Sequence, residues 1–177
     1  VVDAGADYTI PSRTPYRLTG SSTDVDGIGS HTYTWEQYDL GPSGLPSPSL
    51  TEDPLVRSFL PNTSSTRYIP QLEDYLDVFG QSTTWEVMAS VTRDINFRLT
   101  VRDNDVRGGQ LAVDGMVVSV TNTSGPLRII SQNNNSISYE VLSTQTISWQ
   151  VNGTNAGLGG AADVNILLST DGGLTYD

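Results

Sequence analysis

The chain has 177 residues, of which 36% are hydrophobic, 8% aromatic and 16% charged, enough for one sandwich-sized domain and part of another. Its 20 acidic and 9 basic residues give a formal net charge of -11, which argues against binding to nucleic acid or to an anionic membrane surface. The absence of cysteine and the single histidine remove most components of a zinc site or of a cysteine or serine nucleophile, so we predict that the chain is not itself an enzyme.

No stretch of the sequence approaches the roughly 18 to 20 consecutive apolar residues of a membrane span, so we predict no membrane insertion. The chain starts at Val1 without a methionine or a signal-peptide pattern, and it stops at Asp177 within a patterned segment. We therefore expect it to be part of a longer polypeptide.

Short stretches of alternating apolar and polar residues, bounded by glycine, proline, asparagine and aspartate, dominate residues 1–122 and predict antiparallel β-strands. The predicted strands are Tyr8–Ile10, Tyr16–Ser21, His31–Tyr38, Trp85–Val91, Ile95–Arg102 and Leu111–Thr121. In the last of these, Asp114-Gly115 interrupts the apolar alternation and predicts a β-bulge. The pattern predicts an all-β, immunoglobulin-like (PKD/cadherin-like) β-sandwich over residues 1–122, with Trp35 in its core.

A long insert, residues 39–84, separates the third and fourth predicted strands and is rich in proline, serine and glycine. Its Pro70–Gly80 stretch combines a proline start, an acidic first turn and a glycine stop, which predicts one short helix. We expect the insert to pack against the sandwich, because it carries too many apolar side chains to leave in water. These side chains are Leu55, Phe59, Tyr68, Leu72, Leu76 and Phe79.

Residues 127–177 repeat the strand pattern and predict the N-terminal part of a second immunoglobulin-like sandwich. The predicted strands are Leu127–Ser131, Ser138–Val141, Thr144–Val151 and Ala162–Ser169, with Trp149 as a core residue. Four strands are too few to enclose a sandwich core. We expect the core to be completed either by further chain after Asp177 or by strands from a neighbouring subunit.

Acidic residues concentrate in the predicted loops of the first sandwich. Asp24 and Asp26 alternate before Gly27, as in the first half of an EF-hand loop, but position twelve counted from Ser22 is Tyr33 instead of glutamate. In an immunoglobulin-like topology the loops around strands B, C, F and G meet at one end, which predicts convergence of six carboxylates there. These are Asp24, Asp26, Asp103 and Asp114, with Asp7 and Asp105 as second-rank members.

Two interpretations of this acidic end remain open. Converging carboxylates repel one another, and a Ca²⁺ ion with oxygen ligands would relieve the repulsion, which predicts a calcium site. The alternative is a set of solvated aspartates favoured by their turns. The lone His31, at a strand start, is expected on the surface or in a capping role.

Several runs of the sequence resemble the non-catalytic C-terminal region of bacterial secreted reprolysin-like zinc metallopeptidases, in which a PKD-like sandwich precedes a second immunoglobulin-like module. The runs are Leu18–Gly27, Tyr33–Pro42, Arg57–Phe59, Asn96–Asn104 and Val164–Gly173. The resemblance implies an exported, calcium-stabilised accessory region located outside the cell or on its surface. It does not imply peptidase activity, because the family's His-Glu-x-x-His helix is absent from these 177 residues.

Two functions follow as hypotheses. The first is an accessory module that spaces a catalytic domain or directs it towards a substrate or surface. The second is a structural or adhesive module of a surface protein or extracellular filament, assembled by strand pairing. The expected partners are neighbouring domains of the parent chain, a protein or extracellular-matrix target, or further copies of the chain.

Overall fold

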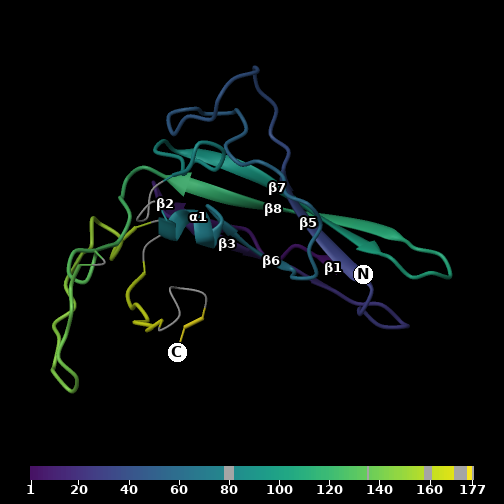
Figure 1. The fold of residues 1–177 in the computed structure, drawn as a ribbon. Coiled ribbons are helices and arrows are strands. Elements are labelled where there is room, and N and C mark those ends of the chain that lie inside the picture. Colours follow the sequence, from purple (N-terminus) through teal and green to yellow (C-terminus); the bar gives the residue numbers. More distant parts are fainter. Residues whose placement is uncertain (78–81, 135, 158–160, 170–174, 177) are drawn as a thin grey trace.

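The computed structural model describes residues 1–77, 82–134, 136–157, 161–169 and 175–176 (Figure 1). Nearly all regular structure in these residues is β-strand, which confirms the predicted all-β class. The elements are β1 (Val2–Asp3), β2 (Tyr8–Pro11), β3 (Tyr16–Thr19), β4 (Ser21–Ser22), β5 (His31–Gln37), β6 (Thr66–Ile69), α1 (Leu72–Asp77), β7 (Arg93–Asp103), β8 (Leu111–Thr121), β9 (Arg128–Ile129) and β10 (Trp149–Gln150). No helix in this part of the chain is long and apolar enough to cross a membrane.

A four-stranded sheet with the order β2-β8-β7-β5 forms the larger layer. Figure 1 shows its two longest strands, β7 and β8, lying side by side. They pair antiparallel without interruption from Arg93 opposite Val120 to Arg102 opposite Leu111, so the predicted bulge at Asp114-Gly115 is wrong. Asp114 interrupts the apolar pattern for a different reason, because its carboxylate accepts a hydrogen bond from the Ala4 N–H.

The second layer is a two-stranded antiparallel sheet of β3 and β6, and β6 comes from the predicted insert. Leu55, Val56 and Ile69 of the insert are buried, which confirms that it packs against the sandwich. Tyr68, in contrast, remains 40% exposed. The predicted helix is observed as α1, while the end of its predicted range and the side chains of Leu76 and Phe79 lie outside the described residues. The buried residues of the insert therefore belong to the core of the sandwich.

The core lies between the two sheets and follows directly from the period-two pattern. Ile95, Phe97 and Leu99 alternate along β7 and are almost fully buried, and the side chains between them face outward. Leu18 and Ile69 close the core from the second sheet. Trp35 is 4% exposed, as predicted. Two facing sheets with one shared apolar core give residues 1–122 the character of a β-sandwich.

The prediction of a strand over Trp85–Val91 is wrong. Residues 86–89 are buried, but the segment is irregular and carries an isolated bridge between Glu86 and Val56. Its backbone N–H groups are used by the insert: Val87 N donates to Leu55 O and Ser90 N donates to Pro48 O. The sequence of such an apolar segment resembles that of a strand, although its backbone hydrogen bonds go to loops and not to a neighbouring strand.

Residues 127–176 form little regular structure, because β9 and β10 pair only with each other in the part that the structure describes. The predicted strands Ser138–Val141 and Ala162–Ser169 are absent there, and Trp149 is 39% exposed instead of buried. No hydrophobic side chain in the described residues of this segment is buried. In the described residues of this segment, no second sheet covers the apolar side chains.

Burial of Tyr16 gives the first testable prediction. Its hydroxyl is buried without a hydrogen-bond partner among the described residues, and burial raises the pKa of Tyr16 far above its ordinary value. Because a buried unsatisfied hydroxyl costs free energy, Tyr16→Phe is expected to raise the free energy of unfolding by about 1 kcal/mol. Urea titration at pH 8 measures it, with the exposed Tyr139→Phe as a control that changes nothing.

Tyr16→Phe should also change how the free energy of unfolding depends on pH. Burial also raises the pKa of Tyr8 to about 12, against an opposing effect of Arg17. A raised folded-state pKa contributes stability that is complete below the unfolded value of about 10 and is lost above it. Unfolding free energy should therefore fall between pH 10 and pH 12, less steeply in Tyr16→Phe. An equal fall in both proteins would show that Tyr16 ionises freely.

Candidate functional site

Two acidic loops meet at one end of the four-stranded sheet. His31, the first residue of β5, pairs with Asp103, the last residue of β7. Because these strands are antiparallel, the loop before β5 and the loop after β7 leave the sheet at the same end. The first loop carries Asp24 and Asp26, and the second carries Asp105, as the loop topology predicted.

The four loop carboxylates line a shallow hollow of about 270 Å³, which we call the acidic hollow. Its ionisable side chains are Asp24, Asp26, Asp103, Asp105 and Arg107. Arg107 Nη2 lies 2.7 Å from Asp26 Oδ2 and 2.7 Å from Asp105 Oδ2. One guanidinium thus links the two loops. Three more carboxylates than guanidinium groups face the same hollow, so it is strongly negative.

Local hydrogen bonds lower the pKa of two of these carboxylates, those of Asp24 and Asp105. The Val25 N–H donates to Asp24 Oδ1 over 2.6 Å, and this bond is the main reason that the pKa of Asp24 is lowered. Hydrogen bonds from the Arg107 side chain lower the pKa of Asp105 in the same way. Asp103 Oδ1 accepts hydrogen bonds from Ser30 Oγ and from the Asp105 N–H. The aspartates therefore hydrogen-bond both within their own loop and to the other loop.

The structure does not bring Asp114 and Asp7 to the acidic hollow. Asp114 Oδ2 accepts a hydrogen bond of 2.8 Å from the Ala4 N–H, which is the main cause of its lowered pKa. Asp7 Oδ1 accepts one of 2.8 Å from the Val117 N–H. These two carboxylates attach the N-terminal segment to β8.

His31 is 5% exposed, so its predicted surface position is wrong. Its Nδ1 lies 2.8 Å from Ser22 Oγ, which lies 2.7 Å from the Tyr33 hydroxyl. Its Nε2 lies 3.7 Å from Asp24 Oδ2, at the edge of the acidic hollow. The sequence did carry an indication of this burial, because His31, Tyr33 and Trp35 occupy alternate positions on one strand.

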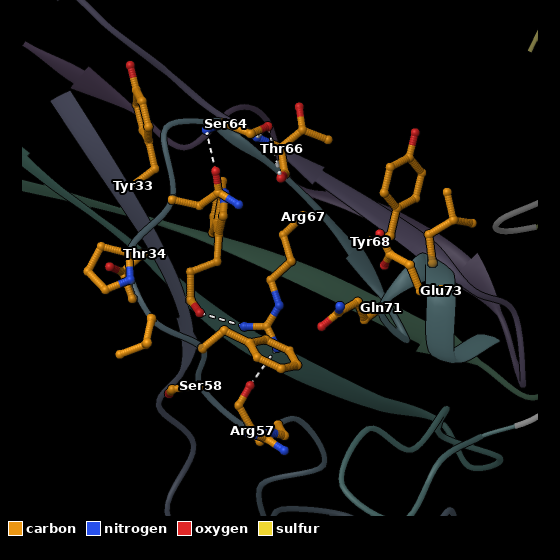
Figure 2. A pocket seen from close by; sticks show the side chains of 16 residues that line it. Tyr33, Thr34, Arg57, Ser58, Ser64, Thr66, Arg67, Tyr68, Gln71 and Glu73 are labelled. Atoms are coloured by element: carbon orange, nitrogen blue, oxygen red, sulfur yellow. Dashed lines mark hydrogen bonds between the residues drawn. The ribbon is translucent and has the colours of Figure 1, made fainter. Parts of the chain in front are cut away.

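A second concave region, with a volume of about 1020 Å³, is lined by β5, by β6 and by neighbouring residues of the insert (Figure 2). Two guanidinium groups contact the Phe59 ring, that of Arg57 at 4.7 Å and that of Arg67 at 4.8 Å from the ring centroid. Arg67 also donates a hydrogen bond of 2.6 Å to Trp35 O and one of 2.7 Å to Glu86 Oε1. Figure 2 shows its side chain extending across this concave region. These bonds occupy Arg67 within the fold, and sequence reasoning did not find them.

Within the described parts of the chain, no group of three or more histidine, cysteine, aspartate or glutamate side chains is arranged to hold one metal ion. In the acidic hollow, Asp26 and Asp105 are held by Arg107. A search with models of known protein families finds no match to this chain, and a search of curated proteins finds no relative.

Proposed function

We propose that the chain is a non-catalytic, calcium-binding β-sandwich accessory module of a secreted or surface-exposed bacterial protein. Its sequence resemblance to the PKD-like and immunoglobulin-like region of reprolysin-like metallopeptidases supports this assignment, with a spacing or targeting role beside a catalytic domain. The single observation that carries the calcium assignment is the convergence of four aspartates from two loops on the acidic hollow.

The donor set suits Ca²⁺ better than other common ions. Ca²⁺ takes six to eight oxygen ligands in irregular arrangements, and the acidic hollow offers the carboxylate oxygens of four aspartates. Asp24 and Asp103 are not bound by Arg107 in the described structure, whereas Asp26 and Asp105 are. Ca²⁺ would therefore compete with the Arg107 guanidinium for the last two carboxylates. Arg107 is 70% exposed and can leave for solvent.

Calcium binding makes a quantitative prediction. At 100 times its dissociation constant, a ligand that binds only the folded state stabilises it by about 2.7 kcal/mol. For a chain of this size that corresponds to a rise in Tm of roughly 5 to 11 °C when CaCl₂ replaces EDTA. Differential scanning calorimetry measures the shift. An unchanged Tm together with no heat of Ca²⁺ binding in titration calorimetry would refute the assignment.

Three variants locate the site. Asp103→Asn should abolish the calcium-dependent rise in Tm, because it removes a ligand that Arg107 does not hold. Asp163→Asn removes an exposed carboxylate in the other segment and should leave the rise intact. Arg107→Gln should bind Ca²⁺ more tightly, because it removes the competing cation while leaving every carboxylate in place.

The structural or adhesive role is the second candidate, and the exposed apolar residues of 127–176 favour it. Together with β3, β6 and α1 they line an apolar groove of about 700 Å³. Exposed apolar surface of this kind recruits a further strand or subunit. The exposed apolar residues of this segment that line the groove include Ile129, Ile147, Trp149, Val164, Ile166 and Leu168.

Self-association of the intact chain is the expected result. Light scattering coupled to gel filtration should show oligomers that increase with protein concentration. Ile166→Asp with Leu168→Asp should restore a monomer, because both side chains are exposed in the apolar groove. Leu60→Asp, at an exposed residue outside that groove, is the control. A strictly monomeric wild-type chain at all concentrations would remove this candidate.

A further inference from the structure

The outer edge of β6 has no partner strand in the described part of the chain, because β6 pairs only with β3 there. Gly20 N donates to Ser65 O over 3.1 Å, and hydrogen-bonded pairs alternate along an antiparallel ladder, so Tyr68 belongs to a pair without hydrogen bonds. Arg17, which lies opposite Tyr68, accepts a hydrogen bond at its C=O from the Tyr8 hydroxyl, in agreement with this register. The N–H and C=O of Tyr68 therefore point away from β3.

These two backbone groups of Tyr68 have no hydrogen-bond partner among the described residues. Thr66, the other residue whose backbone faces this edge, is already bonded, because Ser64 Oγ accepts a hydrogen bond from its N–H and donates one to its C=O. The Tyr68 residue is also 40% exposed. An accessible strand edge with free N–H and C=O groups is the kind of surface to which an extended peptide adds as a further strand.

The second concave region, with its volume of about 1020 Å³, adjoins this edge (Figure 2). Thr66 and Tyr68 line it on the side of β6, and residues 57–62 of the insert also line it. Leu60, in that part of the insert, is 89% exposed and available to contact an apolar side chain. Since ligand sites in proteins commonly have volumes of about 300 to 1,000 Å³, the region has room for a short extended peptide.

The charges in this region favour an acidic peptide. The exposed Arg57 guanidinium lies over the Phe59 ring and forms no ion pair with a carboxylate of the described residues. Arg67 lies over the same ring, and Glu86 is its counter-charge. Among the described residues that line the region, the carboxylate is that of Glu73, which Figure 2 shows apart from Arg57. A guanidinium oriented by a ring and free of a counter-charge is suited to bind a partner's carboxylate.

We propose that this concave region, which we call the peptide groove, binds an extended peptide of another protein that carries an aspartate or glutamate. The peptide backbone pairs with the N–H and C=O of Tyr68, and the peptide carboxylate binds Arg57. Main-chain hydrogen bonds then supply affinity, and the guanidinium supplies the preference for an acidic side chain. The inference rests on the targeting role proposed for the chain, to which it gives a site, but it does not depend on Ca²⁺.

Selection from a random peptide library displayed on phage, with the whole chain as bait and EDTA in the buffer, tests the proposal. The enriched peptides should carry an acidic residue among β-branched and aromatic residues, as expected for a strand. Their synthetic forms should bind Arg57→Gln about 10-fold more weakly than the wild type, or weaker still, because a hydrogen-bonded charge pair is lost. Arg102→Gln, at an exposed arginine of β7 outside the peptide groove, is the matched control and should bind like the wild type.

Amide hydrogen exchange tests the position of the peptide. The Tyr68 N–H should exchange rapidly in the free chain and about 10-fold more slowly, or slower still, when a selected peptide saturates it. The Arg67 N–H, which faces β3, should be protected in both states. A selection without enrichment of acidic peptides, equal binding by Arg57→Gln, or unchanged exchange at Tyr68 would each overturn the inference. Because the buffer contains EDTA, a failure of the calcium proposal would leave these results unaffected.

Discussion

Glu86→Ala is expected to lower the free energy of unfolding by about 3 to 5 kcal/mol, the typical effect of removing one partner of a buried ion pair. Glu86 is 1% exposed, and its Oε1 lies 2.7 Å from Arg67 Nη2. Its Oε2 accepts a hydrogen bond from the Gln71 N–H at the start of α1. The variant therefore leaves a buried guanidinium without its counter-charge and an N–H without its acceptor. Urea unfolding followed by tryptophan fluorescence measures the change.

Two controls make the result specific. Glu73→Ala removes an exposed carboxylate of α1 and should stay within about 0.5 kcal/mol of the wild type. The double variant Arg67→Met, Glu86→Met should lose less stability than Glu86→Ala, because no unpaired charge remains buried. A loss below 1 kcal/mol in Glu86→Ala would mean that Arg67 is satisfied by its carbonyl partners alone.

Leu55→Ala is expected to lower the unfolding free energy by about 2 to 5 kcal/mol, although Leu55 lies in a segment whose composition is that of a loop. Its side chain is fully buried in the core cluster, so truncation leaves a cavity. Leu60→Ala, five residues further along the same segment, is a matched control at 89% exposure and should have almost no effect. Equal effects of the two substitutions would show that the insert does not share the sandwich core.

Three strands of the four-stranded sheet, β5, β7 and β8, could be predicted from the sequence almost to their ends. In β7 and in the second half of β8, the buried apolar residues recur at every second position. β6 could not be predicted, because its inward-facing positions are occupied by Arg67 and Ile69 and only one of them is apolar. The ion pair that makes a buried arginine tolerable involves Glu86, which is distant in sequence and has no local pattern.

The acidic hollow was predictable in part for a geometric reason. Loop topology places Asp24 and Asp105 at one end of the sheet regardless of the detailed register. The position of Asp114 depends on register, since it lies opposite Leu99, four residues from Asp103 along β7. At about 3.3 Å per residue this is roughly 13 Å from the end of the strand. Sequence reasoning can predict strand order more readily than the distance of a residue from the strand end.

The parallel pairing of β2 with β8 determines how these two strands respond to a force applied along them. Tyr8 lies opposite Val118, and Pro11 lies opposite Thr121, so the chain enters at the start of one strand and leaves at the end of its parallel partner. Force applied at these two points slides the strands past each other lengthwise. Every hydrogen bond of the pair is then loaded together, instead of being opened one after another from an end.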